Sequence, residues 1–147
     1  MTQDARRSAA MRVAAAAAVC AMVVTGAIGA AAASGGTWGT AREVPGTATL
    51  NHVYAQVNSL SCASAGNCSA GGTYADVPDS SQAFVASEVN GTWRTAIEVP
   101  GLAALNQGEA AVNSVSCAMA GNCAAVGYYF DSSRHAQAFV VNERPSH

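Results

Sequence analysis

Short runs that alternate apolar and polar side chains recur along the chain after residue 56, separated by turn-forming residues. Alternation with a period of two is typical of strands that bury one face. Asn90-Gly91 predicts a two-residue hairpin, because type I′ turns need positive φ at both central positions. We therefore predict four strands between residues 57 and 99, with ATLNHVYAQ before them as a loop: VNSLSC (57–62), CSAGGTYA (68–75), QAFVASEV (82–89) and TWRTAIEV (92–99).

The predicted Asn90-Gly91 turn sets the register of its two strands. It pairs Glu88 with Trp93, and the same ladder places Phe84 opposite Ile97. Both faces of this ladder are partly apolar, so we expect the sheet to have a neighbour on each side. One face is predicted to carry Phe84, Ala86, Trp93, Thr95 and Ile97, and the other Ala83, Val85, Val89 and Ala96.

The chain contains the same unit twice. Residues 36–90 align with residues 91–145 without a gap, and about 32 of the 55 positions are identical. The clearest matches are GTWGTAREVPG with GTWRTAIEVPG and SCASAGNC with SCAMAGNC. Self-similarity at a fixed period marks a repeat architecture, in which neighbouring units stack to bury a continuous core. We call these units repeat one (36–90) and repeat two (91–145).

The N-terminus has the three parts of a secretory signal peptide. A segment with three arginines precedes the apolar stretch 13–24, and small residues follow up to residue 33. This layout predicts a signal peptide over 1–33, a β-repeat domain over 34–147 and a secreted protein. The alternative is a protein anchored in the membrane by an uncleaved segment, because residues 13–33 are just long enough to span a bilayer.

The composition narrows the function classes. A chain of 147 residues suits one compact domain with a modest core. The net charge is −2, only 11% of the residues are charged, and no basic stripe is present. Nucleic-acid binding is therefore not expected, because proteins that bind nucleic acid carry clustered Lys and Arg.

Four cysteines remain once Cys20 leaves with the signal peptide, and they form two equivalent pairs. Each pair brackets a five-residue loop between two predicted strands, across a hairpin mouth where two Cα atoms can lie close enough for a disulfide. The alternative is a zinc site shared by all four, but structural zinc usually uses shorter spacers and an oxidising compartment favours disulfides. We predict the bridges Cys62–Cys68 and Cys117–Cys123.

The cysteine loops carry a resemblance to a known type of repeat. SCASAGNCSAGGTY and SCAMAGNCAAVGYY resemble the repeat of secreted β-propeller-like proteins of high-GC Gram-positive bacteria. Gly71-Gly72, Tyr74 and Trp93 are loosely similar to kelch and BNR repeats, although the Asp-box of the BNR type has no match. The resemblance implies an all-β fold class with two tandem four-stranded antiparallel propeller-blade-like repeats of 55 residues. An eight-stranded β-sandwich is the alternative.

The strands are offset with respect to the repeat. GTWGTAREV comes before the first complete unit, and NERPSH follows the third strand of repeat two, where another Trp strand would be expected. In a propeller this offset lets the N-terminal strand complete the last blade. Because rings have four to eight blades, we expect two or three chains sharing one ring as a homo-oligomer, an eight-stranded sandwich, or the remnant of a longer propeller protein.

No catalytic constellation emerges from the titratable residues. Asp79 and Glu109 occur in one repeat only and are expected as solvated loop acids. Six other acids form equivalent pairs in the two repeats, which favours turn or edge roles: Asp76 and Asp131, Glu43 and Glu98, Glu88 and Glu143. His52, His135 and His147 have no ligand spacing between them and are expected at the surface. We therefore predict no catalytic residue, no metal ligand and no cofactor.

The candidates for binding are three residues that are replaced by another residue type at the aligned position of the other repeat: Tyr54, Tyr128 and His135. A tyrosine ring gives contact area and its hydroxyl gives a polar group, which suits a sugar or protein partner. The expected function is a secreted non-catalytic β-repeat module that binds glycan or protein at the cell surface. The alternative is a propeller-type glycoside hydrolase or lyase with its acids drawn from the loops.

Overall fold

The computed structural model describes residues 35–144. Contacts divide the chain into two units. The first ends at Trp38, and its described residues, 35–38, form no helix or strand. The second begins at Gly39 and holds every described element. The predicted signal peptide, residues 1–33, lies outside the described residues.

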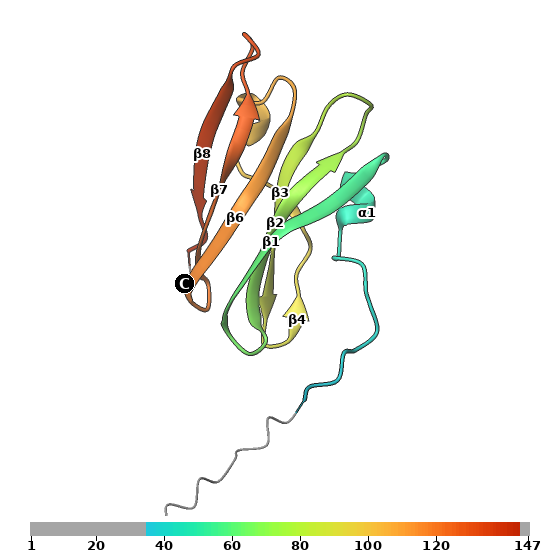
Figure 1. Cartoon of the computed structure of the whole chain (residues 1–147), viewed down its shortest axis with the longest axis vertical. Helices are drawn as coiled ribbons and strands as arrows, with labels where there is room; N and C mark the ends of the chain where they lie inside the picture. Colours follow the sequence, from blue (N-terminus) through green and yellow to red (C-terminus); the bar gives the residue numbers. More distant parts are fainter. Residues whose placement is uncertain (1–34, 145–147) are drawn as a thin grey trace, which may run out of the picture. The chain divides into compact units, whose positions relative to one another are not determined.

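The described chain forms two antiparallel sheets, which confirms the predicted all-β class (Figure 1). In the first sheet the strands β1, β2 and β3 are neighbours in that order, and both β4 and β5 pair with β3: β1 (Tyr54–Ser64), β2 (Asn67–Ala75), β3 (Gln82–Val89), β4 (Thr92–Trp93) and β5 (Ile97–Glu98). The second sheet contains β6 (Ala110–Met119), β7 (Asn122–Phe130) and β8 (Ala136–Asn142) in order. A short helix precedes each sheet, α1 (Thr47–Leu50) and the 3₁₀ turn η1 (Leu102–Ala104).

The predicted fourth strand is split into β4 and β5. The register at the hairpin turn is as predicted, but Val85, and not Phe84, lies opposite Ile97. The prediction is wrong by one residue because the chain leaves the ladder between β4 and β5. There the Ala96 N–H donates to the Pro45 carbonyl at 2.7 Å. Ile97 therefore lies on the same face as Val85.

The segment predicted as a loop, ATLNHVYAQ, contains most of α1 and the start of β1. Glu43, which precedes the N-cap Gly46, stabilises the first turn of α1, because its Oε1 accepts the Ala48 N–H at 2.8 Å and the Thr47 hydroxyl at 3.1 Å. β1 then begins at Tyr54, earlier than its alternating pattern predicts. The loop prediction is therefore wrong for most of this segment.

The two sheets stack face to face, with β6 against β1, β2 and β3 (Figure 1). Ala83 and Val85 of β3 meet Val112 and Val115 of β6 in the core between the sheets. Gly71 of β2 permits a close approach, because a Cβ atom there would lie 2.5 Å from Val112 Cγ1. The two sheets are therefore in direct side-chain contact around Gly71.

Polar side chains of β1 join the two sheets along one edge. Asn58 Nδ2 donates to the Val112 carbonyl at 2.9 Å. The hydroxyls of Ser59 and Ser61 accept backbone N–H groups of β6 at 2.9 and 3.1 Å. β6 is an edge strand, so these bonds satisfy backbone groups that its own ladder leaves free.

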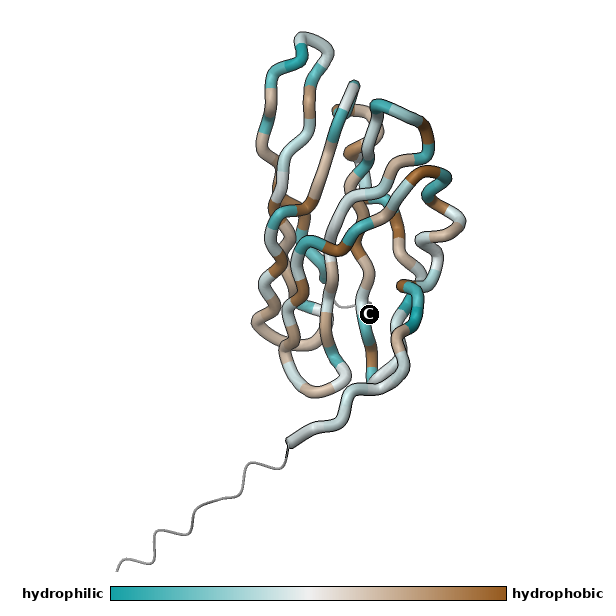
Figure 2. The backbone as a smooth tube through the Cα atoms, turned by 45° about the vertical axis from the view of Figure 1, so that its right-hand side comes forward, coloured by the Kyte–Doolittle hydropathy of each residue, from teal (hydrophilic) through white to brown (hydrophobic). Residues whose placement is uncertain are grey.

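The opposite face of the first sheet carries a second, smaller core. It consists of Tyr74, Phe84, Ala86 and Ala96, with Val44, Leu50 and Trp93 packed against it. In Figure 1, α1 lies on the side of the first sheet that faces away from β6–β8. Apolar contacts therefore occur on both faces of this sheet. Figure 2 shows hydrophobic and hydrophilic residues mixed along the strands.

Both predicted disulfides are present. Cys62–Cys68 closes the β1–β2 hairpin and Cys117–Cys123 closes the β6–β7 hairpin, with Cα atoms 3.9 and 4.0 Å apart. Two disulfides fit an extracellular protein, because reducing compartments keep thiols free. Among the described residues, none of the helices has the length and apolar character needed to cross a membrane.

Candidate functional site

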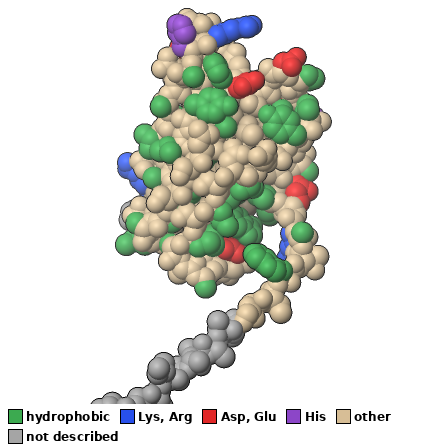
Figure 3. Space-filling model, viewed as in Figure 1, with side chains coloured by type: hydrophobic (Ala, Val, Ile, Leu, Met, Phe, Trp, Pro, Cys, Tyr) green, Lys and Arg blue, Asp and Glu red, His purple; other side chains and the backbone are tan. Residues whose placement is uncertain are grey.

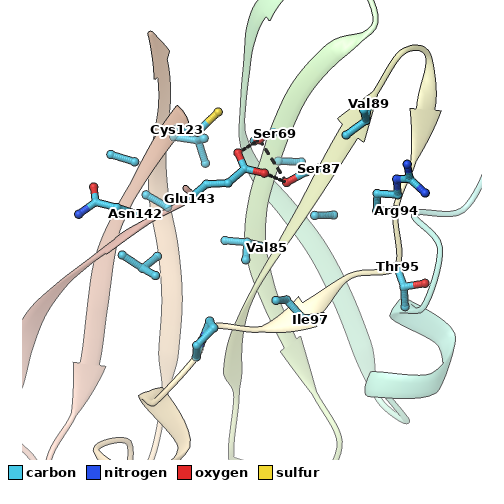
Figure 4. A pocket seen from close by; sticks show the side chains of 17 residues that line it. Ser69, Val85, Ser87, Val89, Arg94, Thr95, Ile97, Cys123, Asn142 and Glu143 are labelled. Carbon is cyan, nitrogen blue, oxygen red and sulfur yellow. Dashed lines mark hydrogen bonds between the residues drawn. The ribbon is translucent and has the colours of Figure 1, made fainter. Parts of the chain in front are cut away.

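A cavity of about 520 Å³ opens between the two sheets beside β8 (Figure 4). This interlayer cavity has the size of common ligand sites, and both sheets contribute to its walls. Its apolar lining includes Val85, Val89, Ile97, Val115 and Val141, and its polar lining is Ser69, Ser87, Arg94, Thr95, Asn142 and Glu143.

Glu143 reaches across the interlayer cavity from the second sheet to the first (Figure 4). Its Oε1 accepts the Ser87 hydroxyl at 2.6 Å, and its Oε2 accepts the Ser69 hydroxyl at 3.1 Å. Its backbone N–H donates to the Cys123 carbonyl at 2.8 Å, beyond the last residue of β8. A carboxylate with both oxygens engaged acts here as a fixed acceptor that joins the two sheets.

The cavity lies beside the outermost long strands of the two sheets, and within residues 35–144 only the strand of the first sheet is paired on its outer edge. β4 and β5 cover the outer edge of β3, whereas its counterpart β8 pairs only with β7 among the described residues. The equivalent phenylalanines show the consequence. Phe84 is fully buried, and its counterpart Phe139 is half-buried.

A tyrosine and a carboxylate interact on the far face of the first sheet. The Tyr74 hydroxyl donates to Glu98 Oε2 at 3.2 Å. Burial first, and then the negative charge of Glu98, raise the pKa of Tyr74 to about 12. The second oxygen, Glu98 Oε1, is buried without a hydrogen-bond partner. This pair therefore holds a neutral phenol inside the small core.

The three predicted contact residues lie away from the interlayer cavity. Tyr54 begins β1 and is exposed, Tyr128 lies in β7, and His135 lies exposed in the β7–β8 turn. The Tyr128 ring packs edge-on against Phe130, with ring centroids 5.8 Å apart. Within residues 35–144, no hydrogen bond or ring contact joins Tyr54, Tyr128 and His135 to one another.

Asp131 organises the β7–β8 turn. Its Oδ1 accepts the N–H groups of Ser133 and His135 at 2.9 and 3.0 Å, and its Oδ2 accepts the Gln137 amide at 2.9 Å. The bond from Gln137, followed by those from the backbone, lowers the pKa of Asp131. Asp131 therefore has the turn role that its repetition predicts.

A smaller hollow of about 340 Å³ lies among the loops next to this turn. It is lined by Asp79, Gln107, Gly108, Glu109, Phe130 and Arg134. Figure 3 shows charged side chains and a histidine at the end of the molecule that holds the β7–β8 turn. This hollow therefore combines side chains of both charges with one aromatic ring.

The part of the chain that the structure describes contains no group of three His, Cys, Asp or Glu side chains that could bind a metal ion. No family model, curated protein or solved structure matches this chain.

The sequence pattern does not predict the interlayer cavity. It assigns Glu143 an edge role, whereas the carboxylate lies between the sheets. One usable signal is that Ser87 alternates with Val85 on the predicted strand 82–89, which places both side chains on one face. The pattern does not say which sheet covers that face, so the contact between Ser87 and Glu143 is visible only in the fold.

Proposed function

We propose that this protein is an exported, non-catalytic binding module that takes an extended protein segment along the outer edge of β8. A large apolar side chain of the segment enters the interlayer cavity. The observation that carries this proposal is that the cavity opens beside β8, whose outer edge has no partner within residues 35–144. Strand addition to a sheet edge supplies backbone hydrogen bonds, and pockets for side chains supply specificity.

The first sheet supports the proposal because it contains the equivalent strand. β4 adds to β3 through the pairs Glu88–Trp93 and Val89–Thr92, and Trp93 packs against the small core. Glu143 is the repeat-two counterpart of Glu88. A segment bound to β8 in the same register therefore places its equivalent of Trp93 opposite Glu143, at the cavity.

The surroundings of the acids support a non-catalytic role. The Glu143 carboxylate accepts two serine hydroxyls, and Glu98 accepts the Tyr74 hydroxyl. Asp131 accepts backbone N–H groups within its own turn. The two disulfides fit export, for which residues 1–33 provide the signal in this proposal. In this proposal each sheet is one blade of a propeller-like assembly. The alternative partner is a glycan, which would bind at the hollow among the loops.

A dye-labelled peptide with the sequence GTWRTAIEVPG, copied from residues 91–101, tests the proposal by fluorescence anisotropy against the full chain. We expect saturable binding, in competition with any segment that already occupies the edge of β8. A peptide with Ser in place of the tryptophan should bind about tenfold more weakly, because buried aromatic anchors dominate such contacts.

Two substitutions in the protein provide a matched comparison. Ile97→Asp should weaken peptide binding because Ile97 lines the cavity, whereas Val77→Asp should not because Val77 lies outside it. The two side chains are 51% and 50% exposed, so they are matched in accessibility. Equal affinities of the two variants, or affinity that does not depend on the peptide tryptophan, would contradict the proposal.

A further inference from the structure

The repeat identifies the segment that fits β8. We infer that β8 takes residues 36–44 of a second copy of this chain, so that copies associate head to tail. The interlayer cavity of one copy then receives Trp38 from the next. This inference rests on the proposed function and names the partner that occupies its site.

Residues 36–44 are the counterpart of residues 91–99, the segment that contains β4 and β5. The two sequences, GTWGTAREV and GTWRTAIEV, differ only at Gly39 and Arg42. Residues 35–44 nevertheless form no helix or strand. In the register of β4 on β3, Trp38 of the second copy lies opposite Glu143, beside the cavity.

Residues 36–44 are not expected to pair with β8 of their own chain. Val44 packs against the small core that contains Tyr74 and Phe84. That core lies on the face of the first sheet that is turned away from the second sheet, because neighbouring positions such as Phe84 and Val85 point to opposite faces. The first sheet therefore separates Val44 from its own β8, and a second copy supplies the partner.

The exposed face of repeat one supports the same arrangement. Val112 and Val115 of β6 are buried against the first sheet, at 0% and 8% exposure. Their counterparts on β1, Val57 and Leu60, are 43% and 58% exposed. β1 thus presents to solvent the kind of surface with which β6 contacts the first sheet.

The far face of repeat two is the complementary surface. Val126 and Val140 are its exposed apolar residues, at 45% and 65% exposure. They are the counterparts of Gly71 and Val85, which face the second sheet within the chain. The contact between the two sheets of one copy can therefore be repeated between the second sheet of one copy and the first sheet of the next.

The polar contacts between the sheets can be repeated in the same way. The three side chains of β1 that bond to β6 have exposed counterparts on β6 itself: Asn113, Ser114 and Ser116. β1 is the edge strand of the first sheet, as β6 is of the second. In the head-to-tail contact these side chains bond to backbone groups of β1 in the next copy.

One difference between the repeats changes the fit. Val126 stands where repeat one has Gly71, and a Cβ atom at Gly71 would lie 2.5 Å from Val112 Cγ1. The contact between copies is therefore wider at this point than the contact within a copy, with Val126 and Val57 side by side.

A contact between the first sheet of one copy and the second sheet of the next is heterologous, and such contacts either close into rings or continue as filaments. Stacked four-stranded sheets close into rings of about four to eight, which corresponds to about two to four copies of this chain. Each copy gives one strand and receives one.

The mass of the purified full chain, measured by light scattering after size-exclusion chromatography, tests the inference. We expect about two to four chains per particle. Leu60→Asp and Val140→Asp should each give a single-chain mass, because each places a charge on one of the two faces. Trp38→Ser should weaken the association, and Val77→Asp, on an exposed loop, should not. A single-chain mass for the unmodified protein at tens of micromolar overturns the inference.

A mixture of the two charged variants tests the head-to-tail arrangement itself. Leu60→Asp keeps the far face of repeat two intact, and Val140→Asp keeps the exposed face of repeat one intact. An equimolar mixture should form particles of two chains, one of each variant, because one intact contact remains. A mixture that stays monomeric overturns the arrangement, since a contact of one face with itself cannot be rescued by mixing.

Peptide binding to Leu60→Asp separates this inference from the proposed function, because that variant keeps β8 and the interlayer cavity unchanged. If it binds GTWRTAIEVPG while the unmodified chain is monomeric, the proposed function stands and the second copy is excluded as the partner. If the variant does not bind the peptide, the proposed function fails and the inference fails with it.

Discussion

Tyr74 shows how a single buried side chain makes the fold sensitive to pH. Its side chain is 4% exposed, and its hydroxyl donates to Glu98, whose other oxygen is buried without a partner. Burial and the negative charge of Glu98 both oppose ionisation, so the pKa of Tyr74 rises from 10.0 to about 12. The folded protein therefore keeps this proton to a higher pH than the unfolded chain does.

We expect the free energy of unfolding to fall as the pH rises from about 10 to about 12, because the unfolded chain releases the Tyr74 proton first. The stabilisation is fully present below pH 10.0, the ordinary pKa of tyrosine. Tyr74→Phe should flatten this decline. Urea unfolding from neutral to strongly alkaline pH measures it, with the exposed Tyr54→Phe as the control. Equal slopes for Tyr74→Phe and the unmodified protein would contradict the prediction.

The sequence predicts residue roles best where a role depends on near neighbours in the chain. The two cysteine pairs and the turn role of Asp131 are local, and both appear as predicted. Glu143 accepts hydrogen bonds from Ser69 and Ser87, which lie 74 and 56 residues earlier in the sequence. Repetition of an acid in both repeats does not reveal such a partner, so its place in the cavity was not predictable.

The two disulfide-closed hairpins have nearly the same sequence but different surroundings. In the first bridge Cys68 is buried, but Cys62 is exposed on the edge strand β1. Cys117 and Cys123 belong to the contact between the sheets, and the Cys117 N–H donates to the Ser61 hydroxyl at 3.1 Å. Because both bridges span six residues, the entropy of loop closure is the same for both.

Replacing both cysteines of either bridge by alanine should therefore cost about 2 kcal/mol in loop entropy. The pair Cys117→Ala and Cys123→Ala should cost about 1 kcal/mol more than the pair Cys62→Ala and Cys68→Ala, because it also leaves space in a core. Urea unfolding of the two double variants measures the difference. Equal losses would mean that packing around the second bridge contributes no more stability than packing around the first.

The alternating pattern predicts the elements that depend on local sequence, and β1, β2 and β3 lie close to their predicted positions. The fourth strand is split because Ala96 bonds to Pro45, about fifty residues earlier in the chain, and strand propensity carries no such information. The pattern does not predict α1, because a one-turn helix depends on its hydrogen bonds to Glu43 and on the packing of Leu50 rather than on a helical period.

The stability of the whole fold depends on how closely its two sheets approach each other. Gly71 lies against Val112 and Val115, and no Cβ atom fits there without a shift of those side chains. Its counterpart, Val126, lies on the far face of the second sheet and is 45% exposed. The same repeat position therefore excludes a side chain in the first sheet and accepts a valine in the second.

Gly71→Val should lower the free energy of unfolding by about 2 kcal/mol or more, because overpacking of a tight core is destabilising. Val126→Ala, the control at the equivalent position, should change it by less than about 1 kcal/mol. Urea unfolding of both variants measures the effect. If Gly71→Val is tolerated as well as Val126→Ala, the close approach of the sheets does not contribute to stability.

At this scale the repeat predicts two similar sheets but not how they sit against each other. A period of 55 residues counts units, whereas the stacking depends on which faces are free and on small residues such as Gly71. The interlayer cavity arises from that stacking together with the open edge of β8, so only the folded chain reveals it.

Each disulfide closes within a single hairpin, and this has a consequence for the maturation of the protein. Four cysteines allow three pairings, and both incorrect ones join thiols about fifty residues apart or more, at a larger entropic cost. A short loop closes far faster than a chain segment of that length diffuses. Under oxidising conditions each hairpin can therefore be closed by its own two thiols, and we expect the native pairing to form without help from an isomerase.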